Sequence, residues 1–163
     1  MKNRLFSLTL KQSFLIVLTL SALPVTVILL NMEAGFSRLA AAGRTGAVYL
    51  FFAFILYGFL VAVRKFPRGR GHRKLVVFTR VYIRFHIAFA VTGAALVLWH
   101  AAGMVLQVSI SGKSASGFLA VGALVPLLWT GYRRKQKSSG KRRRHHRYTA
   151  FVFILIASLH ILL

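Results

Sequence analysis

Apolar residues are gathered in five long stretches that contain no charged side chain. Each stretch approaches the length of about 20 residues that an α-helix needs to cross the hydrocarbon core of a bilayer. The pattern predicts an all-α integral membrane protein in which residues 1–163 form a single domain, a bundle of five transmembrane helices. The predicted helices cover about residues 12–32, 45–63, 79–110, 114–132 and 145–163.

Positive charge marks alternate connections between these stretches. Most lysines and arginines lie in the N-terminal segment and in two connections, Arg64–Arg80 and Arg133–Arg147, whereas the connections around residues 31–44 and 107–113 carry few. Cytoplasmic loops of membrane proteins carry an excess of Lys and Arg. We therefore predict a cytoplasmic N-terminus and an external C-terminus, which five alternating spans allow.

The first apolar stretch has two interpretations. Lys2 and Arg4 precede it, and the small residues Ala40, Ala41 and Ala42 follow, as in a secretory signal peptide. The stretch is longer than the usual apolar core of a signal peptide and the small residues come late, so we favour a retained helix. Either interpretation leaves the other spans unchanged. We expect a multi-pass protein of a bacterial cell (inner) membrane.

The amino-acid composition excludes several kinds of cofactor and catalytic site. Hydrophobic residues make up 57% of the chain, and 23 Lys and Arg stand against one acidic residue, Glu33. The absence of cysteine excludes Cys-ligated iron–sulfur clusters, covalently attached haem and thiol redox motifs. A single carboxylate cannot form a hydrolytic pair. We expect the basic connections to contact the headgroups of the lipid bilayer, and we expect no nucleic acid because no soluble recognition element accompanies the charge.

Histidines repeat at one spacing in two of the predicted helices. His86 and His100 lie fourteen residues apart in the third, and His146 and His160 lie fourteen apart in the fifth. Fourteen residues return to within roughly 40° of the starting direction and rise about 21 Å along a helix. The third and fifth helices are parallel in the predicted topology, so His86 matches the depth of His146, and His100 that of His160.

Two neutral imidazoles from facing helices make a six-coordinate haem b, whose iron exchanges one electron. We therefore predict that the four histidines are axial ligands of two stacked haems. The alternative is a structural role, in which each neutral imidazole is hydrogen-bonded to a backbone carbonyl of a neighbouring helix.

Several neighbouring residues fit haem binding. Gly93 is midway between His86 and His100 and would let a macrocycle approach the backbone, although small residues also serve close helix packing. Phe153 holds the matching midpoint in the fifth helix and could fill the space between the haems. Three arginines lie at the depth of the inner haem's propionates and could pair with them, although flanking charge also explains their position. They are Arg84, Arg144 and Arg147.

The two other histidines are weaker candidates. His145 is fifteen residues from His160 and deviates by about 60° in the other direction, so we prefer His146 as the ligand. His72 lies in a Gly- and Arg-rich connection, and we expect a solvated loop residue there.

These features resemble the ferric reductase-like transmembrane domain of ferric reductases and NADPH oxidases. The likeness covers roughly residues 45–163 and rests on the paired histidines, the Arg-rich last connection and the segments TGAVYL, RFHIAFAVTGAALVLWH, SGFLAVGALVPLLWTGYRR and RHHRYTAFVFILIASLH. The resemblance implies that His86, His100, His146 and His160 bind haem. It also implies that electrons pass from a cytoplasmic flavin donor to an external acceptor such as ferric iron.

The chain also departs from that family. Members typically have a sixth helix, and many continue into a flavin- and nicotinamide-binding domain, whereas this sequence has no G-x-G-x-x-G motif. We therefore expect the electron-transfer subunit of an oxidoreductase, with flavin or NAD(P)H on a separate cytoplasmic flavoprotein reductase or other redox subunit.

Two alternatives stay open. The first is a quinol-linked cytochrome b subunit, which the short cationic connection before the fifth helix disfavours. The second is a non-redox basic membrane scaffold or anchor subunit, which leaves the histidine spacing unexplained.

Overall fold

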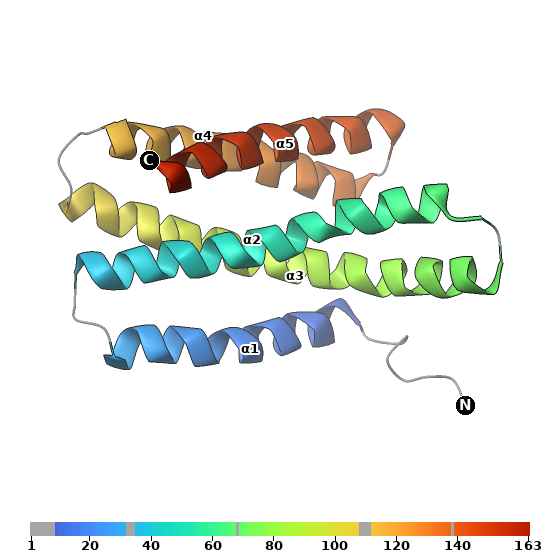
Figure 1. Ribbon diagram of the computed structural model, residues 1–163, viewed down its shortest axis with the longest axis horizontal. Coiled ribbons are helices and arrows are strands. Elements are labelled where there is room, and N and C mark those ends of the chain that lie inside the picture. Colours follow the sequence, from blue (N-terminus) through green and yellow to red (C-terminus); the bar gives the residue numbers. More distant parts are fainter. Residues whose placement is uncertain (1–8, 32–34, 68, 108–111, 138) are drawn as a thin grey trace. The chain divides into compact units, whose positions relative to one another are not determined.

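Five α-helices make up the described part of the chain. The computed structural model describes residues 9–31, 35–67, 69–107, 112–137 and 139–163, and no strand occurs in these ranges. Figure 1 shows the helices in chain order. They are α1 (Leu10–Asn31), α2 (Phe36–Lys65), α3 (Arg70–Gln107), α4 (Gly112–Gln136) and α5 (Gly140–Leu162). The prediction of an all-α protein is confirmed.

Four of these helices, α1 to α4, are long and apolar enough to cross a membrane. Large apolar side chains are exposed along all of them, among them Leu23, Phe51, Leu98 and Leu119. α5 does not reach the same hydropathy, because its first two turns have the sequence GKRRRHHR. Four of the five predicted spans are thus helices that are able to cross a membrane, which supports a multi-pass membrane protein, and the crossing by α5 stays a prediction.

The helices extend beyond the charge-free stretches of the sequence. α2 begins at Phe36 and α3 at Arg70, each nine residues before its predicted start. A charged residue marks where a chain leaves the hydrocarbon but does not end a helix, since Arg and Lys are good helix formers. His72 therefore lies in the first turn of α3, and the interpretation of this residue as part of a solvated loop is wrong.

Contacts between Cα atoms divide the chain into two compact units, Met1–His100 and Ala101–Leu163. The boundary falls within α3. The first unit contains α1, α2 and most of α3, and the second contains α4 and α5.

In the first unit, α2 and α3 run in opposite directions (Figure 1). A Cβ atom added to Gly93 would lie 2.9 Å from Leu50 Cγ and 3.0 Å from the carbonyl oxygen of Gly46, so the two backbones approach closely at this level. The apolar core of the unit joins all three helices around four buried residues. They are Val17, Tyr49, Ala88 and Leu96.

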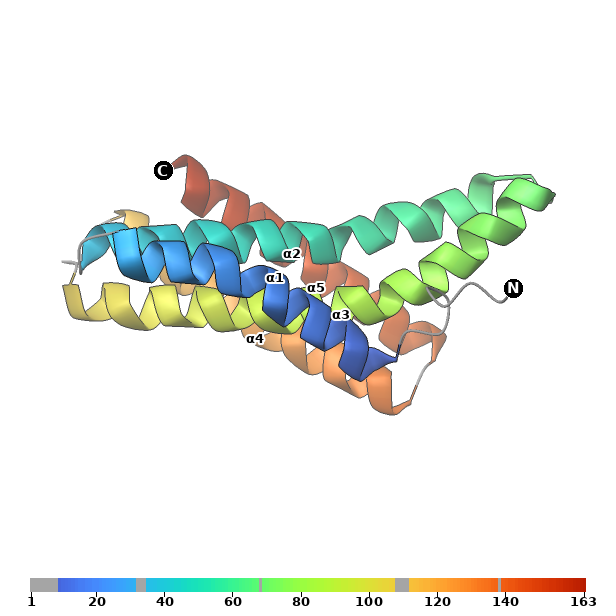
Figure 2. The same ribbon diagram turned by 90° about the horizontal axis from the view of Figure 1, so that it is seen from below.

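In the second unit, α4 and α5 also form an antiparallel pair, which Figure 2 shows from below. Leu124 and Phe153 are buried, at 1% and 6% exposure. Ser139 caps α5, since its Oγ accepts a hydrogen bond from the backbone N–H of Arg142 at 3.2 Å. The cap satisfies one of the amides that a helix leaves unpaired at its N-terminus.

Candidate haem-ligand histidines

His86 and His100 lie on α3 and contact the backbone of α2. The Nδ1 atom of His86 is 2.7 Å from the carbonyl oxygen of Ala53, and that of His100 is 2.8 Å from the carbonyl oxygen of Leu39. A carbonyl can only accept, so each Nδ1 carries a proton and donates it. In the neutral imidazole the lone pair is then on Nε2, the nitrogen that would bind iron.

His146 and His160 lie on α5 and contact hydroxyl groups of α4. The Nδ1 atom of His146 is 3.3 Å from Thr130 Oγ1, and that of His160 is 3.0 Å from Ser116 Oγ. Thr130 Oγ1 also lies 2.8 Å from the carbonyl oxygen of Pro126, to which it donates its proton. With its proton directed to Pro126, the Thr130 hydroxyl can accept a hydrogen bond from Nδ1 of His146, as the carbonyls do in the first unit.

The acceptors repeat the spacing of the histidines. Leu39 and Ala53 are fourteen residues apart on α2, and Ser116 and Thr130 are fourteen apart on α4. Because each of these helices is antiparallel to its partner, an equal spacing on both keeps two levels in register. Each unit thus orients two imidazoles, separated by about 21 Å along the helix axis.

Three of the four imidazoles lie against a glycine. A Cβ atom at Gly43 would be 2.8 Å from Cγ of His100, and Cβ atoms at Gly117 and Gly131 would be 3.1 and 3.3 Å from the nearest ring atoms of the α5 histidines. Gly117 and Gly131 each follow one of the hydroxyl residues, so α4 carries the dipeptides Ser-Gly and Thr-Gly fourteen residues apart. Glycine lets an imidazole approach the neighbouring backbone closely.

The structure separates the two adjacent histidines of α5. His146 is half-buried and faces α4, whereas His145 is exposed. The choice of His146 rather than His145 as a haem ligand stays a prediction.

The two predicted midpoint residues are both buried, but they differ in what surrounds them. Gly93 packs against Gly46 and Leu50 of α2, which is the helix-packing interpretation of a small residue. Phe153 is buried in the second unit and, by the α4–α5 register, lies near the level of Leu124. The haem-contacting role of both residues stays a prediction.

The three predicted propionate partners have different environments. Arg84 is half-buried, and its buried Nη1 has no hydrogen-bond partner within the described ranges. Arg147 is half-buried, and Arg144 is exposed. A buried guanidinium nitrogen that lacks an acceptor favours an anionic group from outside the chain, as a propionate would supply.

The donor set fits a b-type haem. It consists of imidazoles whose Nδ1 atoms are oriented by a second contact, the usual arrangement of metal-ligating histidines. The sequence has no cysteine to attach a haem covalently. Within the residues that the structure places, no three His or acidic side chains gather to hold a bare metal ion. The pairing of His86 with His146, and of His100 with His160, joins the two units and stays a prediction.

Sequence reasoning did not identify the four acceptors. The hydroxyls of Ser116 and Thr130 could have been identified from the sequence, because the Ser-Gly and Thr-Gly dipeptides repeat the fourteen-residue spacing of the histidines. The carbonyls of Leu39 and Ala53 could not, since every residue carries a carbonyl.

Comparison with known protein families, curated proteins and solved structures gave no match.

Proposed function

We propose that this chain is a membrane cytochrome that holds two haem b groups and relays single electrons from the cytoplasmic to the external side. In this proposal His86 and His146 coordinate the inner haem, and His100 and His160 the outer one. All five helices cross the membrane, with the N-terminus cytoplasmic. The electron donor is a separate cytoplasmic flavoprotein reductase, and the acceptor is external, such as ferric iron.

One observation carries the proposal. All four histidines have Nδ1 within hydrogen-bond distance of an oxygen atom on the neighbouring helix, at two levels with the same spacing. The carbonyl contacts of His86 and His100 also fit the structural role, but histidines that only joined helices could present either ring nitrogen and would need no common spacing. Iron ligands need both features, because the second contact sets the tautomer and the ring orientation.

When bound, a haem b with two imidazole ligands supplies a reversible one-electron couple. The residues of this chain hold and orient it. The Nδ1–H···O contacts raise the basicity of Nε2 and limit rotation of each ring. In this proposal Arg84 and Arg147 would neutralise propionates of the inner haem. Gly93 and Phe153 occupy the level between the histidines of each helix.

The proposal predicts which variants share a defect. We expect the purified chain, produced with haem available, to show a reducible Soret band and two haems by pyridine haemochrome assay. The variants His86→Ala and His146→Ala should lose the same haem, and His100→Ala and His160→Ala should lose the other. Redox titration distinguishes the two losses. His145→Ala and His72→Ala are the matched controls and should retain both haems.

Two results would contradict the proposal. Absence of a reducible Soret band in the folded protein would remove the cytochrome function and leave the histidines a structural role. Loss of different haems by His86→Ala and His146→Ala would refute the pairing. Reduction by a quinol analogue without any flavoprotein would replace the proposed donor.

A further inference from the structure

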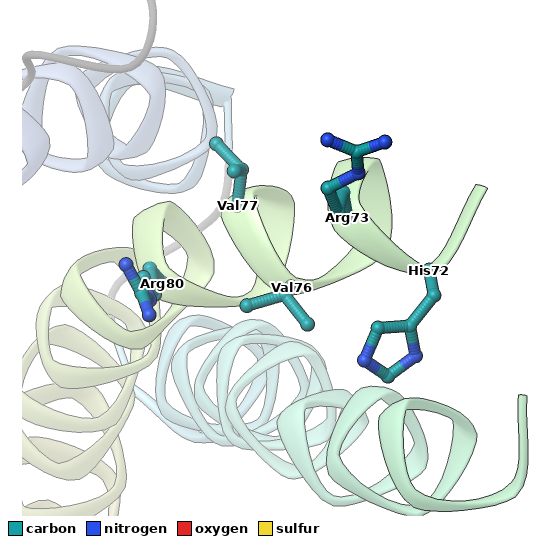
Figure 3. A pocket seen from close by; sticks show the side chains of 5 residues that line it. All are labelled: His72, Arg73, Val76, Val77 and Arg80. Atoms are coloured by element: carbon teal, nitrogen blue, oxygen red, sulfur yellow. The ribbon is translucent and has the colours of Figure 1, made fainter. Parts of the chain in front are cut away.

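A shallow groove of about 370 Å³ follows the first turns of α3. Five side chains line it, and Figure 3 shows that all of them come from this helix, with His72 toward one end and Arg80 toward the other. The lining residues are His72, Arg73, Val76, Val77 and Arg80. The groove belongs to the first unit and contains none of the candidate haem ligands.

The charge of the groove is not balanced by the chain. The guanidinium groups of Arg73 and Arg80 are exposed and lie seven residues apart, about 10 Å along the helix. Arg70 and Lys74 add positive charge nearby. The sequence has one acidic residue, Glu33, which lies outside the described residues. Neutralisation of the groove therefore requires an anion from outside the protein.

His72 supplies a second observation that points to a ligand. Its Nδ1 atom is buried and has no hydrogen-bond partner in the described ranges. A buried polar nitrogen in this state is unfavourable unless an acceptor from elsewhere reaches it. It also lies in the first turn of α3, where unpaired backbone amides favour negative charge.

The remaining lining and the position of the groove indicate which anion it would bind. Val76 and Val77 supply apolar lining at the levels between the two arginines, one on each side of the helix as seen in Figure 3. The groove directly precedes the charge-free part of α3 that begins at Phe85, so it lies where a membrane helix enters the headgroup region. Phosphate beside apolar chain is the chemistry of a phospholipid at this depth, and basic pockets on membrane helices bind anionic headgroups.

We propose that this groove is a binding site for an anionic phospholipid. Arg73 and Arg80 contact the phosphate oxygens, and His72, Val76 and Val77 border the lipid along the two sides of the groove. This proposal is independent of haem binding.

The test measures binding of phosphatidylglycerol to the purified full chain in a neutral detergent, by native mass spectrometry. The variant Arg73→Gln/Arg80→Gln should lose about tenfold or more in affinity, because each arginine near a headgroup contributes appreciably. Arg70→Gln/Lys74→Gln is the matched control. It removes the same charge from the start of the same helix but no lining residue, and it should change the affinity less than twofold.

His72→Ala gives a second measurement and should weaken binding with no change in net charge. Circular dichroism verifies that each variant keeps its helix content. Equal losses in the two double variants would overturn the proposal, since the attraction would then be diffuse. Displacement of the lipid by millimolar inorganic phosphate would also overturn it, because the site would then take free phosphate. Binding of phosphatidylcholine with the same affinity as phosphatidylglycerol would also overturn the proposal, because the site would then not select an anionic lipid.

Discussion

The two histidine pairs are oriented in the same way by different kinds of atoms. In the first unit α2 accepts from His86 and His100 with backbone carbonyls, and in the second unit the α5 histidines lie within hydrogen-bond distance of the hydroxyls of Ser116 and Thr130 on α4. A carbonyl accepts whatever side chain the residue bears. A hydroxyl can donate or accept, so its role depends on its other partners. The same geometry is thus supplied once by the backbone and once by side chains.

Other contacts between helices also use backbone carbonyls in the first unit and side-chain hydroxyls in the second. In the first unit, Tyr82 donates to the carbonyl oxygen of Phe52 at 2.7 Å, and Arg38 donates to that of Leu29 at 3.1 Å. In the second unit, Thr130 Oγ1 and Thr149 Oγ1 are 3.0 Å apart. The α2–α3 pair should therefore be sensitive to bulk that separates the backbones, and the α4–α5 pair to loss of hydroxyls.

The largest effect is expected from Gly93→Ala. The added Cβ would lie 2.9 Å from Leu50 Cγ and 3.0 Å from a backbone oxygen, which cannot move alone. Overpacking of this kind destabilises by about 1–3 kcal/mol, which exceeds the gain of about 1 kcal/mol in helix propensity. Thermal unfolding in detergent measures the loss.

Gly131→Ala is the control in the other unit. Its Cβ would meet only the ring of His146, at 3.3 Å, and a side chain can shift by a few tenths of an ångström. We expect little change in the unfolding midpoint. Equal destabilisation by the two alanines would show that the units do not differ in backbone approach.

A smaller loss is expected when a hydroxyl acceptor is removed. Thr130→Val keeps the shape but leaves Nδ1 of His146 without this acceptor, at a cost of about 1 kcal/mol. Ser116→Ala removes the partner of His160 in the same way and at similar cost. Chemical unfolding in mixed micelles would report both, and Thr130→Ser should restore stability. An unchanged stability in both variants would contradict the role of the hydroxyls.

If haem is bound, the same two variants should raise its reduction potential. Loss of the Nδ1–H···O contact lowers the basicity of the ligand, and a less basic ligand stabilises ferric iron less. Leu39→Met keeps the carbonyl that accepts from His100, so it should leave the potential unchanged. Potentiometric titration followed at the α-band compares them. A shift in Leu39→Met as large as in Ser116→Ala would remove the distinction between backbone and side-chain acceptors.

The smallest effect concerns the start of α5. Ser139→Ala removes the cap on the Arg142 amide, and we expect a loss of about 1 kcal/mol or less. Ser139→Asp keeps an acceptor and adds negative charge beside a basic first turn, so it should be at least as stable as the parent. Helix content during thermal unfolding is the measurement. A stable alanine variant would indicate that packing against α4 alone holds this end.

The positions of the helices could be predicted from the sequence, but the start of α3 and the packing of α2 against α3 could not. Charge-free stretches located all five helices, because burial in hydrocarbon excludes charge. The charge-free stretches did not predict the first nine residues of α3, which begins at Arg70, because a helix can continue beyond the membrane surface. The register of α2 against α3 could not be predicted from the sequence either. It depends on the close contact between Gly46 of α2 and Gly93 of α3.

For the candidate site, the spacing of His86 and His100 was readable, but the direction of each ring was not. The direction of each Nδ1 depends on a backbone carbonyl of α2. The positions of these carbonyls are known only once α2 and α3 are packed together. In the second unit the hydroxyl positions were visible in the sequence, and only their use as acceptors required the structure.

The carbonyl acceptors of α2 have a consequence for sequence drift. Substitutions at positions 39 and 53 can accumulate without loss of the hydrogen bond, provided that the helix and its packing persist. Positions 116 and 130 need a side chain that can form a hydrogen bond with the imidazole, as serine and threonine do here. Two halves under equal functional constraint would therefore diverge at unequal rates, and distant homologues would be easier to detect from α4 than from α2.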